Sequence, residues 1–384
     1  MVRNGNRVGV GCYVDPITPL WSMHANIRLA RVLGADDIWF GDHAKSMFPS
    51  SAWGPHLSPF ARWIPSLDAF LDPTVTIAKY AGRRGPRMGT SVTDAVRRTP
   101  ADLARVWMSL HHLTGGRAVL GIGAGEIENT EPFGLELQPS ASRLEDVVTA
   151  VRAAWESAGT PLTHEGRFHK WHDATFALPP WRRTAPDLWV AGQGPRTCRL
   201  AGREADGWIF ILNAGMDAWH GAAKQMAEGA RAAGKDPESI TRSAYFAPLL
   251  CRNEAAVREL SRQPMVQALL LTLPASAWAA VGGDHPLGTD FKGFSDLDPA
   301  VLEADNLARY GRVITPELLA SLIPCGRAED VLARLQPLID EGLNHVIIYS
   351  AAAALKPRLA AHHLYEQRRL IRLLKNSTPG RFDP

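Results

Sequence analysis

Eight short runs rich in Val, Ile and Leu recur along the chain, and segments of helical periodicity lie between most of them. The runs span residues 8–12, 38–40, 88–92, 118–122, 188–191, 208–212, 245–251 and 346–349. Strands that alternate with helices predict a parallel sheet with right-handed crossovers, and eight of them can close into a (β/α)₈ TIM barrel with insertions. The alternative is an open, doubly wound sheet.

The segments between the strands carry signals for helix ends. Thr99 followed by Pro100 is typical of an N-cap and a first helical position, and Gly115 follows the end of the same helix. Ser142 and Glu145 predict a capping box, with apolar residues at helical spacing after it. These patterns support the alternation of strands and helices.

Three stretches are too long for ordinary connections, at about residues 44–70, 158–186 and 273–325. We expect them to be insertions in a single barrel domain of residues 1–375, followed by a polar tail over 376–384. Long ordered loops are usually lids or binding loops. The first stretch directly follows a strand and contains Phe48, Trp53, Phe60 and Trp63, so it is expected to form an apolar wall for a substrate.

Composition excludes several classes of function. Of the 384 residues, 46% are hydrophobic and 21% charged, and the net charge of +3 is scattered, so a globular core is expected and nucleic-acid binding is not. The four cysteines form no Cys-x-x-Cys pair, which argues against a zinc site or a disulfide framework. No apolar stretch approaches the roughly 20 residues of a membrane span, and no signal region is evident, so the expected location is the cytoplasm.

An acid and a histidine follow the second strand directly. In a parallel barrel, polar residues at the carboxyl ends of strands face the site of chemistry, whereas those at the other end serve stability. Asp42 and His43 occupy that position. A histidine titrates near neutral pH and suits proton transfer, although a hydrogen-bonded core histidine is the alternative.

Two glycine-rich turns also follow strands. Neither completes the Gly-x-Gly-x-x-Gly pattern, because Glu126 and Thr197 occupy the third glycine positions. The turns therefore argue against a Rossmann dinucleotide-binding site. The second turn opens a helix at Pro195, where free N–H groups and the helix dipole favour a phosphate, with Arg196 and Arg199 adding charge. The alternative is a plain tight turn.

Glu126 sits at the end of the first glycine-rich turn. A carboxyl group in a partly apolar pocket can have its pKa raised and act as an acid, whereas the alternative is a surface glutamate.

A metal site is not expected although the chain has 13 histidines. His164, His169, His172 and Asp173 lie in a segment that resembles an added hairpin, but their spacing matches no known ligand pattern.

Four motifs, at residues 41–43, 89–93, 120–126 and 190–195, resemble in order and spacing those of the bacterial-luciferase-like superfamily, over most of the chain. Within it the chain is most similar to reductases and dehydrogenases that depend on the deazaflavin coenzyme F420. Residues 41–49 and 285–293 resemble mycobacterial phthiodiolone and phenolphthiodiolone dimycocerosate ketoreductases. The glucose-6-phosphate dehydrogenases of the group keep a tryptophan after the histidine and a lysine after the sixth strand, and residues 44–47 and 209–213 contain neither in those places.

The resemblance implies a TIM barrel with a non-proline cis peptide in the third strand, here at Ser91–Val92, that backs the deazaflavin ring. It implies His43 and Glu126 as the catalytic acid/base residues. The expected cofactor-binding residues are Asp42, Ser91, Val92, Asn129, Ala191, Gly192, Gln193 and Gly194.

The activity implied is transfer of hydride between C5 of reduced F420 and a carbonyl, with His43 or Glu126 supplying the proton. The expected partner is a small, apolar ketone of lipid or polyketide type, and a homodimer is expected from the resemblance alone. The alternatives are an FMN-dependent monooxygenase, an F420-dependent sugar-phosphate dehydrogenase, a catalytically idle relative and a metal-dependent barrel hydrolase.

Overall fold

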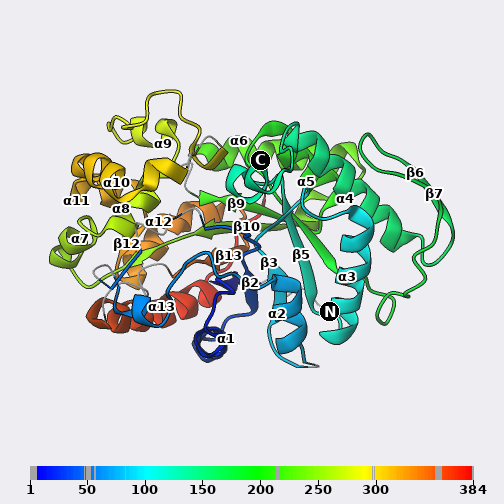
Figure 1. Ribbon diagram of the computed structural model, residues 1–384, viewed down its shortest axis with the longest axis horizontal. Helices are drawn as coiled ribbons and strands as arrows, with labels where there is room; N and C mark the ends of the chain where they lie inside the picture. The colour runs from blue at the N-terminus through cyan, green and yellow to red at the C-terminus, as the bar shows by residue number, and fades with distance from the viewer. Residues whose placement is uncertain are drawn as a thin grey trace.

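Eight parallel strands form a closed barrel in the computed structural model, which describes residues 7–46, 48, 53–55, 58–82, 84–212, 217–295, 297, 299–350 and 357–382 (Figure 1). The strands are β1 (Gly9–Val14), β2 (Asp37–Phe40), β3 (Arg87–Thr90), β5 (Ala118–Gly123), β8 (Asp187–Ala191), β9 (Gly207–Ile211), β10 (Thr241–Phe246) and β13 (His345–Ile348). Their order is β3-β2-β1-β13-β10-β9-β8-β5, and the pairing of β3 with β5 closes the ring. The TIM-barrel prediction is therefore confirmed, and the open sheet is excluded.

Helices surround the barrel because each carries an apolar stripe that packs against the strands (Figure 1). They are α1 (Leu20–Leu33), α2 (Pro73–Tyr80), α3 (Pro100–Leu113), α4 (Ser140–Glu156), α5 (Pro195–Glu204), α6 (Asp217–Ala232), α12 (Ala328–Asp340) and α13 (Pro357–Asn376). The start of α3 is as predicted, since the Asp102 N–H donates to Thr99 Oγ1 at 3.2 Å. Among the described residues, no helix combines the length and the apolar character needed to cross a membrane.

Large aromatic side chains fill the barrel. Trp39 and Trp189 lie inside it with ring centroids 4.8 Å apart, and both are fully buried. Small residues on neighbouring strands make room for them: a Cβ on Gly207 would lie 2.4 Å from the Trp189 ring. This packing closes the middle of the barrel and leaves its carboxyl end for the site.

The seventh barrel strand, β10, begins and ends earlier in the chain than the sequence predicts. It spans Thr241–Phe246, whereas residues 245–251 were expected. Pro248 cannot continue a sheet ladder, and Leu249–Leu250 forms a separate strand, β11, that pairs with β12 (Cys325–Gly326). The strand begins with polar residues, so the search for apolar runs does not detect its start. Arg242 is nevertheless only 2% exposed, because it donates to backbone carbonyls at the amino-terminal end of the barrel.

The capping box expected at Ser142 and Glu145 is wrong. Helix α4 begins at Ser140, and its N-cap Pro139 offers no side-chain hydrogen bond. Both predicted residues accept hydrogen bonds from arginines of α5 instead: Glu145 from Arg196 and Arg203 at 2.6 and 2.7 Å, and Ser142 Oγ from Arg196 at 2.9 Å.

The insertions are organised as small units. An antiparallel hairpin of β6 (Leu162–Glu165) and β7 (Lys170–Ala174) follows α4, as expected. In the described part of the segment between β11 and β12, short α-helices pack around a second apolar cluster containing Trp278. They are α7 (Glu254–Leu260), α8 (Pro264–Leu271), α9 (Ala275–Ala279), α10 (Ala304–Tyr310) and α11 (Pro316–Leu322).

Residues after α13, expected to form a polar tail, pack under the barrel as far as they are described. Phe382 is 6% exposed, and the Arg242 guanidinium lies over its ring at 4.4 Å. The chain end thus covers the amino-terminal end of the barrel.

A buried ion network at this amino-terminal end gives the first prediction. Asp37 is 1% exposed, pairs with Arg87 and accepts a hydrogen bond from His345 Nε2 at 2.7 Å. Burial alone would raise the pKa of Asp37, but the charge of Arg87 and the hydrogen bond from His345 hold this pKa far below its usual value. Removing one partner of a buried pair costs about 3–5 kcal/mol. We expect Asp37→Asn to lower the free energy of unfolding by about 3 kcal/mol in urea denaturation at neutral pH.

The pH dependence of that loss has a definite sign. Because the pKa of Asp37 is lower in the folded than in the unfolded protein, its carboxylate stabilises the folded state fully at pH values above the unfolded pKa of about 4. This stabilisation is lost as the pH falls towards the folded-state pKa. The difference between wild type and Asp37→Asn should therefore shrink in acid. Asp102→Asn, at an exposed carboxylate, is the matched control; an equal loss in both variants would contradict the account.

Candidate active site

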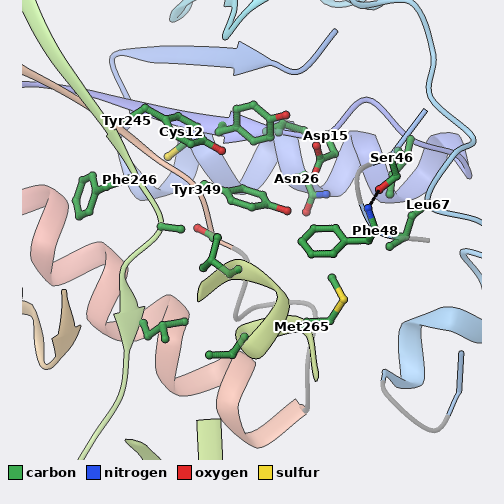
Figure 2. Close-up of a pocket in the computed structure, with 18 of the residues that line it drawn as sticks. Cys12, Asp15, Asn26, Ser46, Phe48, Leu67, Tyr245, Phe246, Met265 and Tyr349 are labelled. Atoms are coloured by element: carbon green, nitrogen blue, oxygen red, sulfur yellow. Dashed lines mark hydrogen bonds between the residues drawn. The ribbon is translucent and has the colours of Figure 1, made fainter. Parts of the chain in front are cut away.

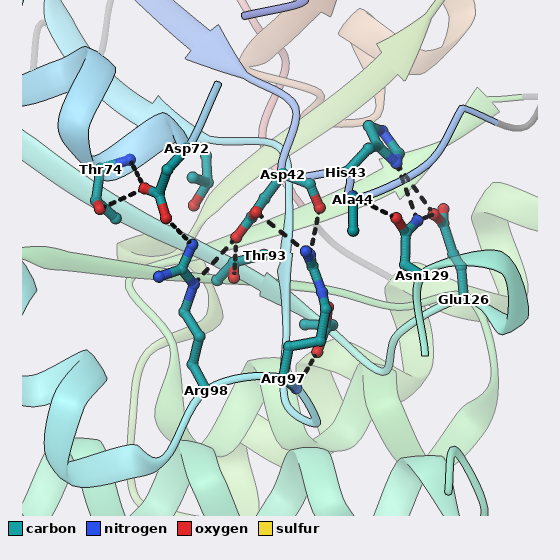
Figure 3. Close-up of polar contacts among 12 residues, drawn as sticks. Asp42, His43, Ala44, Asp72, Thr74, Thr93, Arg97, Arg98, Glu126 and Asn129 are labelled. Carbon is teal, nitrogen blue, oxygen red and sulfur yellow. Dashed lines mark hydrogen bonds and ion pairs between the residues drawn. The ribbon is translucent and has the colours of Figure 1, made fainter. Parts of the chain in front are cut away.

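Three polar side chains meet at the carboxyl end of the barrel (Figure 3). His43 follows β2, and Glu126 and Asn129 follow β5. Glu126 Oε2 lies 3.4 Å from His43 Nδ1, and the Asn129 side-chain amide donates to Glu126 Oε2 at 2.9 Å. The structure thus brings together both residues predicted to be catalytic.

The backbone fixes which way the Asn129 amide points. Its Oδ1 accepts hydrogen bonds from the N–H groups of Ala44 and Lys45 at 2.7 and 3.2 Å. The Nδ2 end therefore faces the imidazole, 3.1 Å from His43 Nδ1. If His43 is neutral with its proton on Nε2, Nδ1 accepts from Asn129; if it is charged, Nδ1–H donates to Glu126. In both states the Nε2–H of His43 remains on the other side of the ring.

Charge raises the pKa of His43. Burial alone would lower this pKa, but the hydrogen bond and negative charge of Glu126, together with Asp15 and Glu128, raise it to about 9. Burial would raise the pKa of Glu126, yet the hydrogen bond and charge of His43 lower it. The pair is therefore an imidazolium and a carboxylate at neutral pH.

Glu128 is a site residue that the sequence did not reveal. It lies in the 3₁₀ turn Ile127–Asn129 and is 4% exposed. Burial and the charge of Glu126 raise the pKa of Glu128 to about 8. Glu128 is thus a buried carboxylic acid that forms a hydrogen bond with Glu126 of the ion pair. In the sequence, its one indication is its position two residues after Glu126.

A second polar group, also missed, lies across from His43. Tyr13 is the penultimate residue of β1, and its hydroxyl lies 3.5 Å from His43 Nε2. Asp15 follows the same strand and bonds to the hydroxyls of Tyr13 and Tyr349, and burial raises its pKa. The rule that singled out His43, a polar residue at a strand's carboxyl end, also applies to Asp15.

Asp42 points away from His43 (Figure 3). Its carboxylate is almost fully buried and accepts from Thr93 Oγ1 at 2.6 Å, while Arg97 and Arg98 approach it to 3.3 Å. These contacts tie β2 to the segment after β3 and hold the backbone before His43. Its predicted contact with a cofactor remains a prediction.

The other predicted cofactor residues lie at the ends of β3 and β8. The Ser91–Val92 bond is cis, as the resemblance implied, and β3 ends at Thr90, with the two-residue strand β4 (Thr93–Asp94) after the bond. Strand β8 ends at Ala191, where Gly192 and Gln193 lead into α5.

The first turn of α5 has no side chain that caps its backbone N–H groups. Gly194 is its N-cap, without a capping side chain, and the first turn contains no acid. A Cβ on Gly194 would have its nearest neighbour at 4.0 Å, so this turn is open. Of the two arginines expected to add charge there, Arg196 is paired with the Glu145 carboxylate, whereas Arg199 donates to the neutral Gln225 amide.

A pocket of about 420 Å³ opens beside the polar group (Figure 2). His43, Tyr13 and Asp15 form its polar end, and most other lining residues are apolar. Phe48, Trp53 and Phe60 line it, as the predicted wall requires, and its role in holding a substrate remains a prediction. Trp63 does not line the pocket and is 55% exposed, so for that residue the prediction is wrong.

One face of α1 forms the long wall of this pocket. Trp21, Ala25, Leu29 and Leu33 line it at intervals of four residues. At 1.5 Å per residue these positions span about 18 Å. The pocket is therefore elongated, and its ionisable residues His43 and Asp15 both lie beside Tyr13.

Fold, motifs and sequence place the chain in a known family: it belongs to the luciferase-like monooxygenase family, whose model matches residues 9–345. The chain is 34% identical over 339 residues to a phthiodiolone/phenolphthiodiolone dimycocerosates ketoreductase of Mycobacterium tuberculosis, covering 88% of this chain and 89% of that protein. The resemblance inferred from the sequence is thus confirmed.

Solved structures agree on the fold. A coenzyme F420-dependent tetrahydromethanopterin reductase from Methanopyrus kandleri superposes with a TM-score of 0.74 at 18% identity, over 96% of this chain and all of that one. An F420-dependent secondary alcohol dehydrogenase, in complex with an F420–acetone adduct, gives a TM-score of 0.71 at 18% identity, over 96% and 99% of the two chains.

Proposed function

We propose that this protein is an F420-dependent ketoreductase that acts on an apolar ketone. The observation that carries the proposal is a charged histidine–glutamate pair at the polar end of an elongated apolar pocket. A general acid must be within reach of the developing alkoxide, and the apolar wall selects the rest of the substrate. The ketoreductase relative supports this substrate class.

The residues fit a planar cofactor with a phosphate group. The Ser91–Val92 segment and the ends of β5 and β8 would face the ring, and Asn129 would contact its edge. The open first turn of α5 would take the phosphate on backbone N–H groups. A reduced deazaflavin bound there would supply a hydride.

The chain's own part is to hold and deliver a proton. Glu126 and Asn129 orient the His43 ring through Nδ1, so Nε2–H is the proton that faces the pocket. As negative charge develops on a substrate oxygen, the His43 imidazolium gives up this proton and becomes neutral, and its remaining Nδ1–H still donates to Glu126. Tyr13, 3.5 Å from Nε2, limits where that oxygen can lie.

The raised pKa of His43 makes ketone reduction depend on pH with a predictable sign. The acid form is present below a pKa of about 9, so kcat/KM should be flat at neutral pH and fall above it. Glu126→Gln removes the charge that raises this pKa, so the fall should move to lower pH. Measured pH profiles of both proteins check this. An unchanged position of the fall would show that His43 is not the group that titrates.

The cofactor assignment is tested by titrating the protein with F420 and, separately, with FMN, following the fluorescence of its 12 tryptophans. We expect at least tenfold tighter binding of F420. Tighter binding of FMN would move the protein to the monooxygenases of its family, and binding of neither would refute the proposal.

A further inference from the structure

The mouth of the pocket carries exposed aromatic residues that the reaction itself does not use. Trp21, at the start of α1, is 53% exposed, and Trp63, just after the 3₁₀ turn Pro59–Arg62, is 55% exposed. Their rings meet edge to face with centroids 6.4 Å apart. Leu20, beside Trp21, is 46% exposed. Two separate segments thus join to form an apolar rim, which we define as Leu20, Trp21 and Trp63.

This rim is continuous with the substrate pocket. Trp21 lines the pocket, and so does Phe60, whose ring lies 6.4 Å from that of Trp63. Exposed tryptophans are costly in water but favourable at a lipid–water boundary, where the ring is half buried and its N–H remains hydrated. A ligand that leaves the pocket past Trp21 therefore passes directly over the rim.

The two segments that carry the rim contain basic but no acidic residues. Residues 16–35 and 44–67, which contain the rim, include no Asp or Glu. They do contain Arg28, seven residues after Trp21 and hence on the same side of α1, and Arg62 and Lys45, all three exposed. Within the part of the chain that the structure describes, no carboxylate forms an ion pair with these three side chains. A cationic, aromatic surface complements anionic lipid.

We propose that the rim docks the pocket mouth onto a lipid surface that contains anionic headgroups, so that an apolar ketone enters from the lipid phase. This inference rests on the proposed function for its substrate, but the surface itself can be tested without cofactor or ketone. The rim residues contact lipid, and Arg28, Lys45 and Arg62 contact the headgroups.

The test is co-sedimentation of the full-length protein with vesicles of phosphatidylcholine alone or of phosphatidylcholine mixed with phosphatidylglycerol. Wild type should bind the anionic vesicles at least tenfold more tightly than the neutral ones, with weaker binding at high salt. Trp63→Glu should reduce that binding at least tenfold, as should the double change Arg28→Glu and Arg62→Glu. Val281→Glu is the control, because Val281 is also exposed but follows α9, far from α1 (Figure 1).

Two results would overturn the proposal. One is equal sedimentation of wild type and Trp63→Glu. The other is a dimer in analytical ultracentrifugation that Trp63→Glu converts to a monomer, which would make the rim an interface between two copies. Reduction of a short, water-soluble ketone is measured in parallel. If the protein reduces the short ketone but does not bind vesicles, only the docking proposal fails. If it binds vesicles but does not reduce the ketone, the docking proposal holds and the ketoreductase proposal is refuted.

Discussion

Replacing His43 by alanine is expected to lower kcat for ketone reduction by roughly 10²–10⁴-fold, the usual contribution of a general acid. The side chain presents Nε2–H at the polar end of the pocket, while Glu126 and Asn129 hold its other nitrogen. Without it, the nearest hydroxyl is that of Tyr13, whose pKa burial raises well above 10, so Tyr13 is a much weaker acid. Steady-state rates with a saturating short ketone provide the measurement.

The controls separate a lost acid from a lost fold. His172→Ala removes an exposed histidine of the β6–β7 hairpin and should leave the rate unchanged. His43→Ala should still bind F420 in the fluorescence titration, because the contacts expected for the cofactor come mainly from other residues. Wild-type turnover by His43→Ala would eliminate His43 as the proton donor.

The second large effect concerns the length of the substrate. Each methylene that enters an apolar pocket gains about 0.8 kcal/mol, or about fourfold in kcat/KM. Because the wall of α1 runs about 18 Å from Trp21 to Leu33, we expect kcat/KM for methyl ketones to rise over roughly ten carbons and then level off. A homologous series of 2-alkanones, solubilised in detergent where required, measures this.

A bulky side chain in the α1 wall should reduce the chain length at which kcat/KM stops rising. Ala25 lines the pocket midway along α1, so Ala25→Trp should stop the rise several carbons earlier. Val32→Trp is the matched control, since Val32 is on the same helix, 62% exposed and not part of the lining. If kcat/KM does not depend on chain length, or if both variants behave alike, the pocket does not hold an alkyl chain.

The sequence predicted the barrel because its strands are continuous apolar runs and its helices have clear periodicity. The same reasoning brought His43 and Glu126 to one end of the barrel, since both follow strand ends. It failed where a tertiary partner decides the outcome. From the sequence, Arg242 is expected in a loop. In the structure it is buried in a strand, because it donates hydrogen bonds to Gly342 and Glu238.

Partners distant in sequence also explain the other misses. Ser142 and Glu145 have the spacing of a capping box, but arginines of α5 compete successfully for both. Tyr13 and Tyr349 are 336 positions apart in the sequence, but their rings are in contact because their strands are neighbours in the closed barrel. Local sequence patterns do not predict such contacts. Burial likewise raises the pKa of Glu128, and no periodicity signals it.

The most direct test of the ketoreductase assignment is to mix the protein with reduced F420 and an apolar methyl ketone without oxygen. The visible absorbance of the oxidised deazaflavin and the alcohol product are followed together. The account predicts that both appear at the same rate in equal amounts, and that His43→Ala slows both. Oxidation of the cofactor only after air is admitted, with no alcohol formed, would contradict it.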